Sequence, residues 1–142
     1  MTLSETEVAA LVQAATQVRE AAYAPYSDHQ VGAAVLAADG TVYSGCNVEF
    51  VSLSQTVHAE RTAVLHMVAA GRRQLRAVAV VGPYSGIPCA ECRQAVWEFA
   101  CGDPEVVVVS APTDGELELL RLGDVYPFPY GPETKGIDPR AV

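Results

Sequence analysis

Residues 106–109 are four consecutive valines, and this run constrains the fold more than any other feature of the chain. A strand with one face in water alternates apolar and polar side chains, whereas an unbroken β-branched run is typical of a strand covered on both faces. Residues 77–81 form a second continuous apolar run, of alanine and valine, and segments with helical periodicity lie between the apolar runs. Helices that alternate with doubly covered strands indicate an α/β protein, so we expect a three-layer α/β/α sandwich.

The other elements follow from the period of the apolar residues and from the turn residues. In chain order we expect a helix over residues 4–22, strands over 31–36 and 41–46, a helix over 57–70, a strand over 77–81, a helix over 89–99, a strand over 105–110, and a strand or short helix over 117–120. Ser4 and Glu7 fit a capping box, and the turn at 38–40 predicts a hairpin. The helix over 57–70 is apolar nearly all round, so we expect it to be buried.

Composition sets the class of protein. The 142 residues fit one domain over residues 1–142. With 17 acidic and 9 basic side chains the net charge is −8, and such a surface repels polyanions, which argues against nucleic acid or an anionic membrane as the main partner. No apolar run approaches the about 20 residues of a membrane helix, and no signal-peptide pattern opens the chain. Four cysteines without an export signal therefore favour the reducing cytoplasm.

Three residues have the chemistry of metal ligands: His58, Cys89 and Cys92. The two cysteines stand three residues apart at the expected start of a helix, where both sulfurs share one face and the helix N-terminus favours thiolates. His58 opens another expected helix. One imidazole and two thiolates leave the fourth position of tetrahedral zinc open for water, as catalytic zinc requires.

Glu60 follows His58 by two residues and can reach a zinc-bound water without binding the metal itself. His-x-Glu followed by Pro-Cys-x-x-Cys, here at 58–60 and 88–92, is the established signature of zinc-dependent deaminases. Zinc supplies hydroxide at neutral pH, and Glu60 carries a proton from the water to a ring nitrogen and then to the departing amine. A structural or assembly zinc module and a redox pair are the alternatives, and neither explains Glu60.

From about residue 22 to residue 131 the chain resembles the cytidine deaminases that act on free nucleosides. The motifs that carry the resemblance are Pro25-Tyr26-Ser27, Val31-Gly32-Ala33-Ala34, Gly45-Cys46-Asn47-Val48-Glu49, His58-Ala59-Glu60-Arg61-Thr62-Ala63 and Pro88-Cys89-x-x-Cys92-Arg93-Gln94. Purine-base and tRNA-adenosine deaminases share the zinc motif but do not typically carry the Asn-x-Glu and Cys-Arg-Gln motifs. The resemblance implies a cytidine deaminase-like sandwich with a mixed central sheet, a Zn²⁺ cofactor, and hydrolytic deamination of an aminopyrimidine nucleoside such as cytidine or deoxycytidine.

The resemblance also implies roles for residues outside the zinc motif. Asn47 and Glu49 bind the sugar hydroxyls, which suits an amide and a carboxylate on alternate positions of one strand face; a turn cap and a solvated charge are the alternatives. The backbone N–H groups of Ala59 and Cys89 lie near the pyrimidine and the zinc water. Short members form homotetramers with shared active sites, and Tyr130 aligns with an aromatic residue that stacks on the base from another subunit. A tail aromatic packed in its own chain is the alternative.

Two departures from the short members, at positions 58 and 91, concern the metal and bear on the role of Arg61. His58 stands where they usually present a cysteine, as in the longer two-domain members. Arg61 follows the expected catalytic Glu, and in three-cysteine members the arginine at that place offsets the extra thiolate charge. With only two thiolates here, that role for Arg61 is undefined. Glu91 replaces a small residue between the cysteines and adds negative charge beside the metal.

Other departures lie around the substrate. His29 stands where a phenylalanine stacks near the nucleoside, and we include it among the substrate-binding residues. Phe50, Val51 and Leu53 replace the usual residues at positions that meet a neighbouring subunit's site. These changes leave open an alternative substrate, namely a nucleoside antibiotic such as blasticidin S or another modified aminated base. A nucleic-acid editing deaminase is a further alternative, but the net charge of −8 argues against it.

The remaining reactive residues are given structural roles. We interpret His66 as a surface or core histidine rather than a metal ligand, although it lies on the same expected helix as His58. We expect Cys46 and Cys101 to be small core residues, and Trp97 to lie in the core or an interface.

Overall fold

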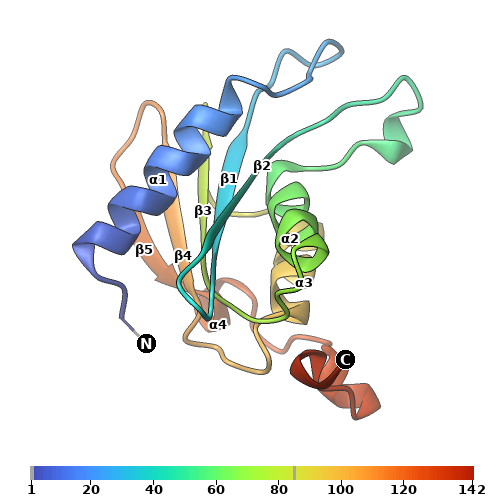
Figure 1. The fold of residues 1–142 in the computed structure, drawn as a ribbon. Coiled ribbons are helices and arrows are strands. Elements are labelled where there is room, and N and C mark those ends of the chain that lie inside the picture. Colours follow the sequence, from blue (N-terminus) through green and yellow to red (C-terminus); the bar gives the residue numbers. More distant parts are fainter. Residues whose placement is uncertain (1, 85) are drawn as a thin grey trace.

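The computed structural model describes residues 2–84 and 86–142 and places a five-stranded sheet between two helical layers (Figure 1). The helices are α1 (Glu5–Arg19), α2 (Ala59–Ala69), α3 (Ala90–Glu98) and α4 (Leu122–Val125), and the strands are β1 (Gly32–Ala37), β2 (Val42–Cys46), β3 (Leu75–Gly82), β4 (Val107–Pro112) and β5 (Glu118–Arg121). Short 3-10 helices lie at Leu53–Gln55, Pro132–Lys135 and Pro139–Ala141. In this described part of the chain, no helix has the length and apolar character needed to cross a membrane.

The sheet is mixed and has the strand order β2-β1-β3-β4-β5. The expected hairpin pairs β1 with β2 antiparallel, with Ala34 opposite Ser44. β3 pairs antiparallel with β1 and parallel with β4, with Val78 opposite Val108. A parallel pair needs a crossover connection, and α3 provides it between β3 and β4. Three residues of the valine run, 107–109, therefore lie in β4, which pairs with β3 on one edge and β5 on the other.

Both faces of the sheet are covered, which explains why its inner strands are apolar without interruption. α1 lies on one face, where Leu11 and Ala15 join a buried cluster with Leu36 of β1. α2 and α3 lie on the opposite face (Figure 1), where Met67 and Val96 join a second buried cluster. Every residue of β1 is buried between the two layers. The expected three-layer arrangement is confirmed.

The helix that begins after residue 57 is not buried all round, so that expectation is wrong for the single chain. Ala63, Val64 and Met67 of α2 are buried against the sheet. Leu65 is 56% exposed, although it is as apolar as they are. An outer helix has the sheet on one side only, so its other side is open to solvent unless something outside the chain covers it.

Other expectations are met or corrected locally. The Ser4 and Glu7 capping box is present, with Glu7 N donating to Ser4 Oγ at 3.1 Å and Ser4 N donating to the Glu7 carboxylate at 2.9 Å. Within residues 117–120, a strand begins at Glu118, and this stretch forms most of β5 and no helix. Cys46 and Cys101 are only half-buried, so the core assignment is wrong for both. Cys101 lies in the turn after α3, with a φ of 55°.

The C-terminal tail is attached to α3. Arg93 Nη1 donates to the carbonyl of Val125, and Gln94 Nε2 donates to the carbonyl of Tyr130 at 2.6 Å. Trp97 is buried, as expected, and its Nε1 donates to Glu133 Oε1 at 3.2 Å. The Arg-Gln part of the Cys-Arg-Gln motif therefore holds the tail.

Gly45 of β2 allows α2 to approach the sheet. A Cβ at this position would lie 2.3 Å from the amide nitrogen of Ala63. We expect Gly45→Ala to lower the free energy of unfolding by about 1–3 kcal/mol, the cost of overpacking a closed interior, as measured by urea denaturation. Gly82→Ala is the matched control, because its Cβ would meet only the Val31 side chain, at 3.4 Å. Equal stability of the two variants would contradict this account.

Candidate active site

His58, Cys89 and Cys92 come together at the N-terminal ends of α2 and α3. His58 is the N-cap residue of α2, Cys89 is the N-cap residue of α3, and Cys92 lies in the first turn of α3. His58 Nδ1 is 3.4 Å from Cys89 Sγ and 3.5 Å from Cys92 Sγ. All three potential ligand atoms lie within 4.8 Å of one another. The three residues expected to bind a metal are in position to do so.

The donor set fits zinc in both geometry and chemistry. Tetrahedral zinc, with nitrogen at about 2.0 Å and sulfur at about 2.3 Å, has N···S edges of about 3.5 Å. The separations of 3.4 and 3.5 Å match these edges. Burial raises the pKa of the Cys92 thiol, and the nearby Glu60 and Cys89 raise it further. Because thiolates are the ligand form, a bound cation is the partner that stabilises this charge.

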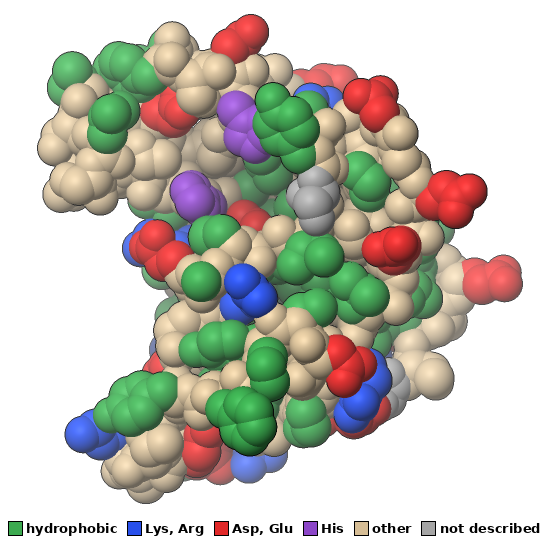
Figure 2. Space-filling view, turned by 180° about the vertical axis from the view of Figure 1, so that it is seen from behind, with side chains coloured by type: hydrophobic (Ala, Val, Ile, Leu, Met, Phe, Trp, Pro, Cys, Tyr) green, Lys and Arg blue, Asp and Glu red, His purple; other side chains and the backbone are tan. Residues whose placement is uncertain are grey.

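A cavity of about 230 Å³ opens beside these donors. The expected site residues on its wall are His29, Asn47, Glu49, His58, Ala59, Glu60 and Cys89. Figure 2 shows that this face of the molecule is hollowed and that histidine side chains lie beside the hollow. The cavity is smaller than the about 300–1,000 Å³ of sites for drug-sized ligands. It therefore suits a compact substrate.

Asn47 lies just past the end of β2 and connects the cavity wall to the loop before β1. Its Oδ1 accepts from the N–H of Val31 at 2.9 Å, and its Nδ2 donates to the carbonyl of His29 at 2.7 Å. The side chain is 6% exposed. Asn47 thus caps the loop backbone and lines the cavity at the same time, and one Nδ2 hydrogen remains for a ligand.

Glu49 is a buried carboxylate and not a solvated charge. Its Oε1 accepts from the N–H groups of Tyr26 and Ser27 at 3.0 and 3.2 Å, and its Oε2 accepts from the Ser27 hydroxyl at 2.6 Å. The Ser27 hydroxyl lowers the pKa of Glu49 most, and the two N–H groups lower it further, against the opposing effect of burial. Glu49 is therefore held ionised, with lone-pair capacity left on Oε2 for a ligand hydroxyl.

His29 lies on the cavity wall and stacks on Tyr84. The two ring centroids are 5.1 Å apart and the ring planes differ by 19°. Tyr84 lies in the loop after β3 and is 75% exposed. Sequence reasoning missed Tyr84, because it is far from His29 in the chain and belongs to no motif. Only the folding of two loops toward the same cavity brings the rings together.

Arg61 and Glu91, the two charged residues beside the expected metal ligands, form an ion pair. Neither residue is among those that line the cavity. The charge of Arg61 is thus directed to a carboxylate on the neighbouring helix. The sequence placed both residues beside the metal but did not predict that they contact each other.

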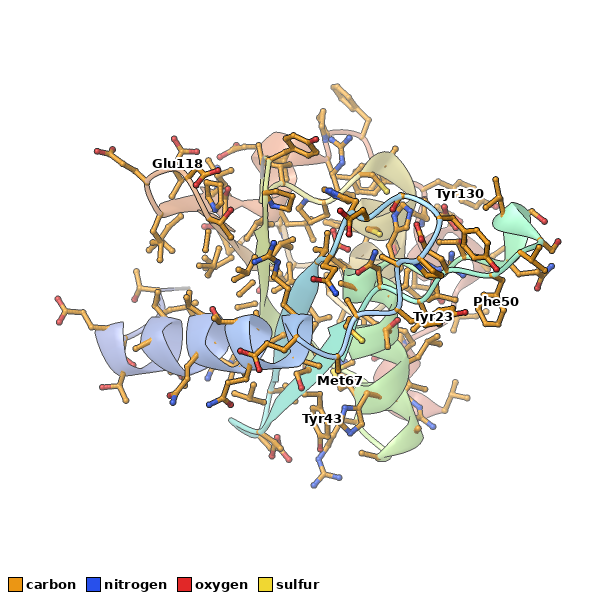
Figure 3. All side chains as sticks on the ribbon, turned by 90° about the horizontal axis from the view of Figure 1, so that it is seen from above. Tyr23, Tyr43, Phe50, Met67, Glu118 and Tyr130 are labelled. Carbon is orange, nitrogen blue, oxygen red and sulfur yellow. The ribbon has the colours of Figure 1, made fainter. Side chains whose placement is uncertain are left out.

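Tyr130 is not among the residues that line the cavity. Its side chain is 62% exposed, so the alternative of a tail aromatic packed within its own chain is wrong. Tyr23 and Phe50 are exposed as well, and in the projection of Figure 3 they and Tyr130 lie on the side opposite Glu118.

His66 has a structural role, as expected. Its Nδ1 lies 3.0 Å from the carbonyl oxygen of Ser44. The edge of its ring meets Tyr43, with centroids 5.2 Å apart and planes at 79°. Among the described residues it is not part of the metal-binding group.

The comparisons with known proteins point to one family. The family model described as "Cytidine and deoxycytidylate deaminase zinc-binding region" matches residues 5–110. A cytidine deaminase of Sporosarcina psychrophila is 40% identical over 131 residues, covering 89% of this chain and 93% of that protein. The crystal structure of cytidine deaminase from Burkholderia pseudomallei has a TM-score of 0.80 at 40% identity, covering 90% of this chain and 100% of that one. That from Mycobacterium tuberculosis has a TM-score of 0.74 at 38% identity, covering 87% and 96%.

An α/β sandwich that groups one histidine and two cysteines beside a cavity with a buried glutamate on its wall defines a zinc-dependent deaminase. The chain belongs to the cytidine and deoxycytidylate deaminase family. The zinc cofactor and the hydrolytic reaction class implied by the sequence resemblance are confirmed at the level of this family.

Removal of one donor should remove the metal. We expect Cys92→Ser to weaken zinc binding by more than the about 10–100-fold that follows loss of a ligand's outer hydrogen-bond partner, because only two donors remain. Cys101→Ser is the control, since that sulfur lies 3.8 Å from the Arg73 carbonyl and outside the metal-binding group. Metal analysis after gel filtration measures the zinc per chain. Equal zinc contents in the two variants would rule out this ligand set.

Proposed function

We propose that this chain converts free cytidine and deoxycytidine by hydrolysis to uridine and deoxyuridine, with release of ammonia. The observation that carries the proposal is a single cavity with Glu60 and metal-binding groups on one part of its wall and Asn47 and Glu49 on another. The reacting base and the sugar of one nucleoside would thus each meet suitable side chains. The relatives' name, cytidine deaminase, supports the same substrate.

Glu60 is the proton carrier in this mechanism. Glu60 is 6% exposed and lies on the cavity wall. It accepts a proton from the attacking water, delivers it to the ring nitrogen beside the amino-bearing carbon, and assists protonation of the departing amine. His58, Cys89 and Cys92 would hold a zinc ion, and such an ion would supply the Lewis-acid charge that activates water at neutral pH. The ring carbon exchanges its amino group for a carbonyl oxygen, and ammonia leaves.

The substrate is bound by side chains and by backbone. Asn47 and Glu49 hydrogen-bond the sugar hydroxyls through the donor and acceptor capacity that the loop leaves unused. The N–H groups of Ala59, the first residue of α2, and Cys89, the N-cap of α3, would face the base and the attacking water. Glu49 and Glu60 make the cavity acidic, and an acidic cavity repels a phosphate. A free nucleoside is therefore favoured over a nucleotide.

A modified aminated base, such as that of blasticidin S, is the second candidate substrate. The stack of His29 on Tyr84 supports it, because the ring at the cavity wall has a neighbour that the motifs did not foresee. A histidine ring held by a tyrosine offers hydrogen bonds as well as a flat face. Turnover of a substrate panel separates the two candidates.

We propose that the chain acts as a cytoplasmic homotetramer with shared active sites. Phe50, Val51, Leu53 and Tyr130 are all exposed in the single chain, and a partner subunit would cover them. Tyr130 would then reach the base in a neighbouring cavity. The net charge of −8 argues against nucleic acid or an anionic membrane as the partner. Light scattering after gel filtration measures the number of subunits.

Loss of the proton carrier should abolish turnover and leave the metal in place. We expect Glu60→Gln to lower kcat for cytidine by about 10²–10⁴-fold, the usual contribution of a positioned acid–base group. Ammonia release is measured for zinc-loaded wild type and variant with cytidine, deoxycytidine, CMP, cytosine, adenosine, guanine and blasticidin S.

The panel also decides the substrate. Fast turnover of cytidine or deoxycytidine that depends on Glu60 supports the proposal. Full zinc occupancy with turnover of neither nucleoside would retire it, and release of ammonia from blasticidin S alone would establish the second candidate.

The hydrogen bond from Ser27 to Glu49 should determine the lowest pH at which the sugar site binds substrate. The pKa of Glu49 is lowered, so its carboxylate accepts from a sugar hydroxyl until the pH falls below the ordinary carboxyl range. Ser27→Ala removes the largest cause of that shift, so the pKa of Glu49 rises. We expect the KM for cytidine to begin rising at a higher pH, on the acid side, than in wild type.

Ser27→Thr keeps the hydroxyl and serves as the control. Initial rates between pH 4 and pH 8 give KM and kcat for the three proteins. Superimposable acid limbs for wild type and Ser27→Ala would show that Glu49 does not contact the substrate in its ionised form.

A further inference from the structure

The Arg61–Glu91 ion pair joins the two helices that carry the metal-binding residues. Arg61 is in the first turn of α2, directly after Glu60, and Glu91 is in the first turn of α3, between Cys89 and Cys92. Arg61 Nη1 donates to Glu91 Oε1. The Arg61 side chain is 33% exposed and the Glu91 side chain is 64% exposed.

The pair is not part of the cavity wall. Arg61 and Glu91 instead line a separate groove of about 380 Å³ between α2 and α3, together with Leu65 and Phe99. The inner sides of α2 and α3 pack in one buried cluster that includes Val64 and Val96, and the groove lies on their outer side. The ion pair bridges the groove at the end where the metal-binding residues lie.

The separation of the metal-binding atoms depends on how α2 and α3 are placed relative to each other. Cys89 and Cys92 belong to the start of one helix, so its backbone sets the distance between their sulfurs. His58 comes from the other helix, and its Nδ1 lies 3.4 and 3.5 Å from the two sulfurs. A small shift of α2 against α3 changes both distances and leaves each helix intact.

We propose that the Arg61–Glu91 ion pair is a clamp that holds His58 at the correct distance from the two cysteines. The inference rests on the proposed function, because it takes these three residues to bind zinc. Arg61 and Glu91 are positioning residues, since they act through the ligands and do not line the cavity. In three-cysteine members the arginine at this place offsets the charge of a third thiolate. This chain has only two cysteine ligands, and Arg61 pairs with Glu91 instead.

The effect of the clamp should be modest and sensitive to salt. Partly exposed ion pairs change equilibria or rates by about two- to fivefold. At about 1 M salt the screening length falls to about 3 Å, so an exposed pair contributes little. A role in retaining the metal therefore predicts faster loss of zinc when either charge is removed, and a smaller difference at high salt.

The test follows the transfer of zinc from the loaded protein to a coloured chelator. We expect Arg61→Gln and Glu91→Gln each to release zinc about two- to fivefold faster than wild type. The double variant should release it no faster than the faster single variant, because both substitutions break the same contact. The exchanged pair, Arg61→Glu with Glu91→Arg, should return the rate to within about twofold of wild type.

Arg72→Gln is the matched control. It breaks the Arg72–Asp39 pair, whose side chains are 46% and 40% exposed, and which joins the hairpin turn to the segment after α2. This variant should release zinc at the wild-type rate. Cytidine turnover by the zinc-saturated single variants should keep the wild-type KM, because neither residue lines the cavity.

The outcomes separate the clamp from its alternatives. If Arg61→Gln speeds release but Glu91→Gln does not, Arg61 acts on the ligands by itself and the clamp is overturned. If every variant releases zinc at the wild-type rate, the clamp is overturned while a wild type that deaminates cytidine keeps the proposed function. A wild type that holds no zinc would overturn both.

Discussion

The close approach of α2 to the sheet is the contact on which the site depends. Gly45 leaves no room for a side chain between β2 and the backbone at Ala63, so α2 lies directly on the strand. His58 and Glu60 are at the start of this helix, and their position follows from that contact. Cys89 is brought to the same place by a different route, the crossover from β3 into α3. The donor set therefore forms only when both helices pack correctly.

The substrate cavity is built in a different way, from hydrogen bonds between side chains and backbone. Asn47 and Glu49 follow β2 and hold the loop over residues 26–31 through its N–H and C=O groups. Such bonds fix the loop before any ligand arrives, which lowers the conformational entropy lost on binding. The same two side chains keep donor and acceptor capacity toward the cavity. Asn47 and Glu49 thus both fix the conformation of the loop and recognise the ligand.

Much of the site was predictable because its signals are local. A zinc-dependent deaminase is predicted by two local spacings, that of Cys89 and Cys92 and that of Glu60 two residues after His58. The start of each helix then favours the ionised ligands. Burial was less predictable: Leu65 belongs to an apolar helix but faces away from the sheet. Periodicity reports how apolar a segment is, and what covers each of its sides depends on neighbours that are distant in the chain.

By itself, the sequence determined the fold class, the residues of the metal site and the reaction class, because each is encoded in a short pattern with its own physical reason. Only the tertiary structure decided which residues meet across the chain. The stack of His29 on Tyr84 and the ion pair of Arg61 with Glu91 join segments that share no motif. The exposed place of Tyr130 depends likewise on how the tail packs on α3. Such contacts depend on the relative placement of helices and loops, which is set by the packing of the whole core.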